Sequence, residues 1–283
     1  MTDLAVPLDV EGVDTPRPQT LLLTFFGGHV LDRGIHVATA SVLEVLERAG
    51  ISEHATRSTL SRMARRGLLS RVRRGRHVYL GLTDRSRAIL HDGERRIWRA
   101  GAVNRQWDGT WTLLGFSMPE SWQRQRHALR SRLLWAGFGS LQGGLWIAPG
   151  QVDPAPLLDG LDADGHVRVF QARPLPPTQV AEIVQEAWNI DRLAEHYQAF
   201  LARWQDPEAQ APDSLARDLL LESDWLRTIR DDPRLPREHL PADWPAEPAQ
   251  ELFYALSAEL KTAARTIAAG LLDTITDEQA DER

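Results

Sequence analysis

The sequence has no cysteine, only one lysine and no long apolar stretch, and these absences limit what the chain can be. Without cysteine it has no disulfide, no thiolate metal site and no cysteine nucleophile. No stretch of about 18 consecutive apolar residues occurs, and the N-terminus is acidic rather than basic and then apolar. We therefore expect neither a membrane span nor a signal peptide, and a cytoplasmic location. The length of 283 residues, with 42% hydrophobic residues, suffices for about two or three domains with apolar cores.

Acidic residues are absent from one segment in particular. Between His54 and Tyr79 the chain carries eight arginines and no aspartate or glutamate, although its formal net charge is -6. A basic segment in an acidic protein indicates a local surface for a polyanion. From residue 186 to the end, in contrast, acids outnumber bases by about two to one. DNA would repel such a region, which leaves it for dimerisation, ligand sensing or both.

The basic segment begins with a helix that has one apolar and one polar face. Ser52 can cap its N-terminus, because a serine hydroxyl accepts a hydrogen bond from a free N–H of the first turn, and Gly67 marks its end. The face that we expect to be buried comprises Ile51, Ala55, Thr59, Leu60 and Met63. The opposite face carries Arg57, Ser58, Ser61, Arg62 and Arg65. These side chains can reach base edges and phosphates in a major groove, although a solvated basic face is the alternative at this point.

The segments on both sides of this helix favour DNA binding. Helices are expected over 18–31 and 39–49, and the short turn Gly50-Ile51-Ser52 then leads into the basic helix, which makes a helix-turn-helix. Apolar strands over 69–72 and 78–82 follow it. The turn between the strands is a basic hairpin tip, in which the glycine permits the turn. Residues 17–83 are therefore predicted to be a winged helix-turn-helix domain that binds double-stranded DNA through the polar helix face and through Arg73, Arg74, Gly75 and Arg76.

The remaining chain is predicted to hold a middle and a C-terminal domain, which makes the protein an α+β multidomain protein. Residues 1–16 are expected to be a disordered leader and 84–106 a linker helix. Strand and helix signals alternate over 107–176 as β-α-β-β-α-β, the order of a ferredoxin-like sheet. The strands are expected over 111–116, 138–142, 143–148 and 167–172, and the helices over 121–135 and 155–161.

The C-terminal part is predicted to be helical. A helical domain is expected over 177–272, interrupted by a proline-rich crossing near 231–245, and an acidic, frayed tail over 273–283. All ten tryptophans lie from Trp98 onward, and we assign most of them to packing within and between domains. A few could instead stack on an aromatic ligand.

Enzyme and metal sites find little support in the sequence. The glycines of residues 137–143 (GFGSLQG) have the spacing GxGxxxG, which is neither a dinucleotide fingerprint nor a GxSxG elbow. We expect this segment to pack a tight turn. The nine histidines are scattered without HxxxH or HExxH spacing, so that no metal site, no cofactor and no catalytic residue are predicted.

Several segments in order resemble the PaaX-type repressors of aromatic-acid catabolism, over about residues 18 to 270. The segments that carry this resemblance are RSTLSRM with GLL (57–63, 67–69), GRHVYLGLT (75–83), GFGSL with GLWIAP (137–141, 144–149), AWNI (187–190) with Tyr197 and Phe200, and DPRLP with LP and DWP (232–236, 240–241, 243–245). Each segment is modest alone, but their joint order is specific.

The resemblance implies a dimeric repressor that an aryl-CoA thioester, such as phenylacetyl-CoA, releases from operator DNA. Such a protein would be bacterial and associated with the nucleoid when bound. The effector needs cations for its phosphates. Four arginines of the middle helix are candidates for this role: Arg124, Arg126, Arg130 and Arg132. A solvated helix face explains these arginines equally well.

The resemblance also implies that the middle domain is similar to the ferredoxin-like nuclease of CRISPR adaptation. A metal-dependent nuclease with a winged-helix head is therefore the alternative function. Such nucleases hold a divalent cation with an aspartate near the end of the first strand, but here the segment Leu114-Gly115-Phe116-Ser117 contains no acid. We therefore expect a scaffold without catalysis.

Overall fold

The computed structural model describes residues 17–98 and 102–281, and its contacts divide the chain into two compact units. The first, called the N-terminal unit, contains residues 17–98, 200–227 and 251–281; the second, called the central unit, contains residues 102–199 and 228–250. The expected leader of residues 1–16 lies outside the described residues. The chain thus enters the N-terminal unit again at residues 200–227 and 251–281, whereas the sequence suggested three domains one after the other.

The N-terminal unit begins with three helices: α1 (Pro18–His29), α2 (Thr39–Arg48) and α3 (Glu53–Arg65). The Ser52 hydroxyl caps α3 by accepting a hydrogen bond from Ala55 N–H, as its place before the helix predicted. The apolar faces of the three helices meet in a common core, in which these side chains are at most 2% exposed: Leu21, Leu22, Phe25, Phe26, Val42, Val45, Leu46, Leu60 and Met63. Burial of these faces stabilises the arrangement, because apolar surface is removed from water.

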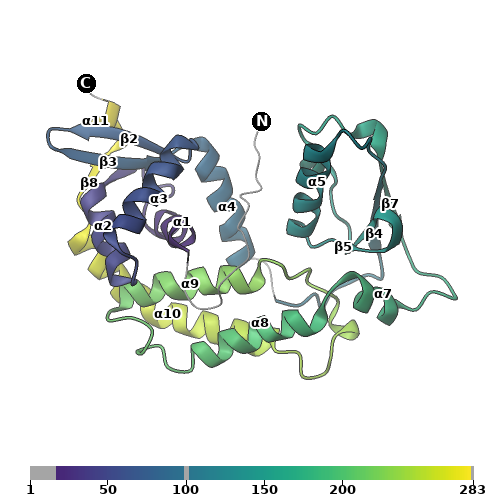
Figure 1. Ribbon diagram of the computed structural model, residues 1–283. Helices are drawn as coiled ribbons and strands as arrows, with labels where there is room; N and C mark the ends of the chain where they lie inside the picture. Colours follow the sequence, from purple (N-terminus) through teal and green to yellow (C-terminus); the bar gives the residue numbers. More distant parts are fainter. Residues whose placement is uncertain (1–16, 99–101, 282–283) are drawn as a thin grey trace. The chain divides into compact units, whose positions relative to one another are not determined.

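A four-stranded antiparallel sheet accompanies these helices, in the order β2-β3-β1-β8. Strands β2 (Leu69–Arg74) and β3 (His77–Leu82) form the expected hairpin, with Leu69 opposite Leu82 and Arg74 opposite His77. Strand β1 (Ile35–Ala38), which the sequence pattern did not reveal, pairs with β3. Figure 1 shows the hairpin extending from the helices as a two-stranded ribbon.

The fourth strand comes from the C-terminal end of the chain. Strand β8 (Thr274–Thr276) pairs with β1, and the short helix α11 (Asp277–Asp281) follows it (Figure 1). The expectation of a frayed tail over 273–283 is therefore wrong for residues 273–281. A strand of three residues is too short to show the alternation of apolar and polar side chains by which strands are recognised. This segment is extended because it pairs with the free edge of β1.

Four longer helices belong wholly or partly to the N-terminal unit: α4 (Asp84–Trp98), α8 (Ile190–Arg203), α9 (Ser214–Ile229) and α10 (Ala246–Leu271). Within this unit Trp225 stacks on Phe253, with ring centroids 4.9 Å apart, and Phe200 packs at a tilt against Trp225, with ring centroids 5.3 Å apart. Trp98 continues this cluster, 5.3 Å from Phe253. Large aromatic contacts of this kind hold α4 to the late helices, which explains why most of the expected linker and residues 200–227 and 251–272 of the expected C-terminal domain join the first unit.

The central unit contains the expected β-α-β-β-α-β order. Its elements are β4 (Trp111–Phe116), α5 (Gln123–Trp135), β5 (Gly139–Ser140), β6 (Leu145–Pro149), α6 (Ala155–Leu158) and β7 (Val167–Ala172). The antiparallel sheet has the order β5-β6-β4-β7, so the first strand lies between the third and the fourth. Strand β5 is shorter than the predicted 138–142, because the 3-10 turn Gln142–Gly144 begins where we expected strand.

The sheet of the central unit separates two apolar clusters. One includes Leu114, Leu129 and Phe138; the other includes Trp111, Ile147 and Trp188, together with α7 (Val180–Ala187). A Cβ on Gly139 would lie 2.6 Å from the Ala187 carbonyl oxygen, which is too close for any side chain. The packing role that we predicted for the glycine-rich segment is confirmed at this position.

Candidate nucleic-acid interface and ligand pocket

The polar face of α3 is exposed over its whole length. All five residues predicted there lie at the surface: Arg57, Ser58, Ser61, Arg62 and Arg65. On the other face Thr59, Leu60 and Met63 are buried as expected, whereas Ala55 is only half-buried. Thr56 is fully buried in its place and donates a hydrogen bond to the Ser52 carbonyl. The helix thus presents a continuous basic and hydroxyl-bearing surface to solvent.

Local contacts orient some of these side chains. Arg57 Nε lies 2.6 Å from Glu53 Oε1, one turn earlier, so that part of its charge is balanced within α3. Arg62 Nη2 donates to Thr59 Oγ1 at 2.9 Å. Arg57 can exchange an exposed partner for a phosphate at little cost, because surface ion pairs are weak.

Arg71 of β2 joins this surface, although we did not assign it to the site. Its Nη2 donates to Ser61 Oγ at 3.3 Å, which connects the hairpin to the exposed face of α3. The alternation of side chains along a strand could have predicted its exposure. In β2, Arg71 and Arg73 are exposed, whereas Val72 and Arg74 are half-buried. The basic surface therefore extends from the helix onto the hairpin.

The hairpin tip is basic, as predicted, but its arginines are not equivalent. Gly75 has a φ of 57°, which explains the glycine, and Arg73 Nε donates to its carbonyl. Arg73 and Arg76 are exposed. Arg74 is half-buried, and its buried Nη2 has no hydrogen-bond partner among the described residues. Within the tip, Arg73 and Arg76 are therefore better placed than Arg74 to contact a polyanion.

Three hydrogen bonds hold the hairpin against the helices. Thr39 Oγ1 donates to the Val78 carbonyl at 2.8 Å, and Thr83 Oγ1 donates to the Gly67 carbonyl at 2.8 Å. The Tyr79 hydroxyl donates to Asp273 Oδ2 at 3.0 Å. The hairpin is thus connected to α2, to the end of α3 and to the C-terminal segment.

The C-terminal segment is in turn anchored to β1 and α2. Ser41 Oγ donates to the Leu271 carbonyl at 3.1 Å and accepts from Asp273 N–H at 3.0 Å. The Asp273 carbonyl accepts from Ala38 N–H at 2.8 Å. Sequence reasoning missed these contacts, since the partners are about 230 residues apart and no local pattern links them.

The His36 side chain of β1 contacts β2, β3 and α11. From β1, its Nδ1 lies 3.1 Å from Asp277 Oδ1, and its Nε2 lies 3.2 Å from Ser70 Oγ. Gly81 of β3 lies against the imidazole ring, where a Cβ would come within 2.3 Å of Nε2. The close approach of the ring requires glycine at position 81.

The four arginines of α5 that we named for ligand phosphates do not form one cluster. The Arg132 guanidinium donates to the carbonyls of Leu157 and Asp159, and Arg126 donates to that of Met118. Arg124 and Arg130 are exposed. Two of the four side chains therefore brace the fold of the central unit, and positions 126 and 130 share a helix face that differs from that of 124 and 132.

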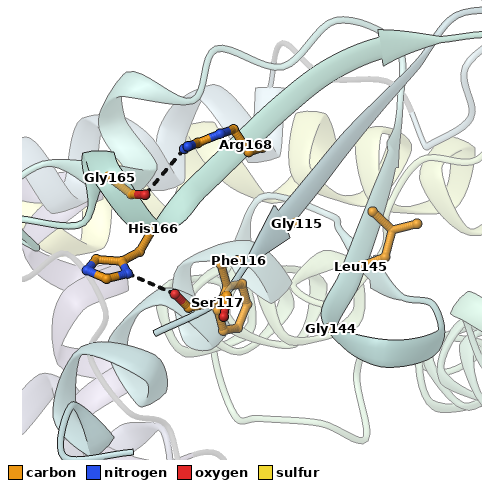
Figure 2. Close-up of a pocket in the computed structure, with 8 residues that line it drawn as sticks. All are labelled: Gly115, Phe116, Ser117, Gly144, Leu145, Gly165, His166 and Arg168. Carbon is orange, nitrogen blue, oxygen red and sulfur yellow. Dashed lines mark hydrogen bonds between the residues drawn. The ribbon is translucent and has the colours of Figure 1, made fainter. Parts of the chain in front are cut away.

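An open hollow of about 580 Å³ lies at one end of the central sheet, where β4 ends and β6 and β7 begin (Figure 2). Its lining comprises Gly115, Phe116, Ser117, Gly144, Leu145, Gly165, His166 and Arg168. His166 Nδ1 donates to the Ser117 carbonyl at 2.9 Å, and Ser117 N–H donates to the His166 carbonyl at 2.9 Å. These bonds fix the rim between β4 and β7. Among the described residues that line the hollow, none is acidic.

Buried ionisable groups lie in the helical part of the N-terminal unit. Burial, together with the nearby Arg33, Arg265 and Lys261, lowers the pKa of His29 to about 4. Burial raises the pKa of Asp218 in α9 to about 6. Burial, followed by the charge of Asp218, raises the pKa of Glu222 to about 8. Each shift disfavours the charged form of its group.

The described residues contain neither a cluster of metal-binding side chains nor a helix that could span a membrane. Within residues 17–98 and 102–281, no three histidine or acidic side chains lie together in a way that could hold a metal ion. Over the same residues, no helix combines the length and the apolar character needed to cross a membrane.

Comparisons with known proteins agree with the described elements. Family models match three successive segments: "PaaX-like protein" at residues 17–86, "PaaX protein central Cas2-like domain" at 104–184 and "PaaX-like protein C-terminal domain" at 188–270. The transcriptional repressor PaaX of Escherichia coli (strain K12) is 28% identical over 260 residues, which cover 87% of this chain and 81% of that protein.

A solved structure, the uncharacterized protein Rv0674 from Mycobacterium tuberculosis, has a TM-score of 0.59 and 24% identity over 89% of this chain and 98% of its own. At this identity the likeness supports the fold alone. The curated relative is a transcriptional repressor, which agrees with the expectation that this chain is a regulator and not an enzyme. Because three models of one family match in order over most of the chain, the protein belongs to the PaaX family.

Proposed function

We propose that this protein is a transcriptional repressor that binds operator DNA through α3 and the β2–β3 hairpin. The observation that carries the proposal is that exposed arginines of α3 and of the hairpin are joined through the contact of Arg71 on β2 with Ser61 on α3. In this arrangement α3 acts as the recognition helix of a winged helix-turn-helix and the hairpin as its wing. The E. coli relative is named as a repressor, which supports the same function.

The helix α3 and the hairpin tip carry side chains suited to different contacts with DNA. Ser58, Ser61 and Arg62 on α3 can donate hydrogen bonds to base edges in a major groove. Arg73 and Arg76 at the tip can pair with phosphates, which positions the protein without selecting a sequence. Arginine suits both tasks, because its planar guanidinium binds phosphate or guanine in a bidentate manner.

We further propose that the protein acts as a homodimer in the cytoplasm and that an aryl-CoA thioester releases it from DNA. Two heads related by two-fold symmetry would occupy successive major grooves of a roughly palindromic site. The effector can relieve repression only by binding the DNA-incompetent arrangement more tightly than the competent one. The support for this effector is the family resemblance, with phenylacetyl-CoA as the compound to test first.

The experiment is a DNA-binding titration with the upstream region of the protein's own gene. Phenylacetyl-CoA should release the protein, whereas free CoA should not. If about four arginines per head meet phosphates in a dimer, log affinity should fall with log salt at a slope near -7. Tight binding that neither compound changes would retain the DNA-binding function and discard this effector. An absence of specific binding would refute the central proposal.

The nuclease alternative is tested with the same DNA. The central unit carries Gly115-Phe116-Ser117 at the end of its first strand, where a metal-binding nuclease needs a carboxylate. We expect no cleavage of operator DNA in the presence of Mg²⁺ or Mn²⁺. Metal-dependent cleavage that purifies with the protein would establish the alternative.

A further inference from the structure

We propose that the hollow at the end of the central sheet binds the anionic group of an organic effector that also carries an apolar or aromatic part. This inference rests on the proposed function, because it assigns a place to the effector of that function. The hollow has the size of a small-molecule site, about 580 Å³ within the usual range of about 300 to 1,000 Å³. Its residues come from the ends of three strands, which hold them rigidly (Figure 2).

Three glycines leave space at the hollow. Gly115, Gly144 and Gly165 line the hollow from three different segments. A Cβ on Gly165 would meet no atom within 4 Å, and one on Gly115 would meet only Leu145 Cδ1, at 3.9 Å. The hollow is therefore open because side chains are absent at these positions, and a ligand can approach the backbone there.

Hydrogen bonds to backbone carbonyls position the side chains of His166 and Arg168 at the hollow. Because His166 Nδ1 donates to the Ser117 carbonyl, its Nε2 is the nitrogen left for a ligand. Arg168 Nη1 donates to the carbonyls of Gly165 and Val167, at 3.3 and 2.8 Å, which holds the guanidinium beside the hollow. The donors on its Nη2 and Nε have no partner among the described residues and can bind a carboxylate or phosphate.

Apolar side chains line the hollow beside these groups. Phe116 and Leu145 line the hollow, and Figure 2 shows their side chains at the ends of β4 and β6. Trp122 lies edge-to-face against His166, with ring centroids 4.9 Å apart. Aromatic and apolar surface next to a guanidinium suits an aryl or acyl group joined to an anion.

The described lining carries a guanidinium, that of Arg168, and its described members include no carboxylate. This charge favours an anionic ligand. The arginines of α5 are less suitable as an anion site, because Arg126 and Arg132 already donate to backbone carbonyls. The anionic oxygens could belong to the carboxylate of a free aryl acid or to the phosphates of a CoA thioester, and the test distinguishes these sources.

Isothermal titration of the full-length protein with four probes tests the proposal: phenylacetate, phenylacetyl-CoA, free CoA and inorganic phosphate. We expect saturable binding of at least one organic probe and a loss of about tenfold or more in affinity for Arg168→Gln. Gly115→Val, which fills the hollow with a residue that favours strands, should abolish binding. Arg173→Gln, at the other end of β7, is the matched control and should bind as the wild type does.

Binding of phenylacetate identifies the carboxylate as the recognised anion, and binding of CoA alone identifies the phosphates. If Arg168→Gln and Gly115→Val, both shown to be folded by circular dichroism, bind every probe like the wild type, the hollow is not the site and the proposal is wrong. If no probe binds the wild type, the proposal is equally wrong, while operator binding measured in parallel still decides the proposed function. Ligand binding without operator binding would retain the pocket and refute the repressor.

Discussion

The hydroxyl of Tyr79, in the hairpin strand β3, donates a hydrogen bond to the carboxylate of Asp273, 194 residues later in the chain. The backbone of Asp273 also bonds Ala38, the last residue of β1, and the Ser41 hydroxyl in α2. One C-terminal residue therefore contacts β3, β1 and α2 together. Because β3 carries one side of the hairpin, this contact connects the end of α10 with the proposed DNA-binding surface.

Replacing Tyr79 with phenylalanine should weaken DNA binding without unfolding the protein. The substitution removes the hydrogen bond to Asp273 but keeps the buried ring, so the hairpin is held less firmly while the core is retained. We expect a loss of about threefold to tenfold in operator affinity, measured by fluorescence anisotropy.

Asp273→Ala is a second test of the same contact, because it shows whether DNA affinity rises or falls when Asp273 is removed. Electrostatics alone predicts tighter DNA binding after an acid is removed, whereas loss of positioning predicts weaker binding. Unchanged affinity of Tyr79→Phe, or tighter binding of Asp273→Ala, would contradict the positioning role.

Replacing Arg71 with glutamine should remove a phosphate contact. Arg71 is exposed beside Ser61, between α3 and the hairpin tip. We expect weaker binding to all sequences and a slope of log affinity against log salt that is smaller by about one for each head. Arg95→Gln, an exposed arginine of α4 outside this surface, is the control and should leave the slope unchanged. A slope for Arg71→Gln equal to that of the wild type would place Arg71 outside the interface.

Two glycine-to-alanine substitutions should have opposite effects on stability. Gly81→Ala forces the new methyl group into the His36 ring, which Ser70 and Asp277 flank, and should destabilise the protein by about 2 kcal/mol. Gly28→Ala, at an exposed position of α1 with no atom within 4 Å of the new Cβ, should stabilise it by about 0.5 kcal/mol. Denaturant unfolding monitored by circular dichroism measures both. Equal effects would show that His36 moves away freely.

Stability should decrease as the pH rises from about 6.5 to 8. The raised pKa of Glu222, about 8, means that the folded chain binds more protons than the unfolded chain in this range, so deprotonation favours unfolding. The pKa of His29 is lowered from 6.5 to about 4, so between these pH values the unfolded chain binds more protons at this residue than the folded chain. His29 therefore makes stability rise with pH below about 6.5 and has little effect above it.

Glu222→Gln isolates this effect, since glutamine does not titrate. Thermal unfolding at pH 6.5, 7.2 and 8 should show a midpoint that falls in the wild type and changes less in the variant. Parallel curves for the two proteins would show that another group is responsible.

Local signals were sufficient for part of the candidate interface. The Ser52 cap, the glycine at 67 and the four-residue spacing of apolar side chains predicted α3 and its exposed face, since each signal acts within one or two helical turns. The basic hairpin tip followed in the same way from Gly75 between two apolar runs. Arg71 was missed because its proximity to α3 depends on how the hairpin packs.

The sequence by itself determined the order of helices and strands and the basic character of one surface, because caps, periods and turn residues are encoded by neighbouring residues. Only the tertiary structure decided that residues 274–276 complete the first sheet, that Arg126 and Arg132 brace the central unit, and that three glycines leave a hollow beside His166 and Arg168. These features depend on residues far apart in the chain. Their positions follow from the packing of a whole unit, which no local pattern reports.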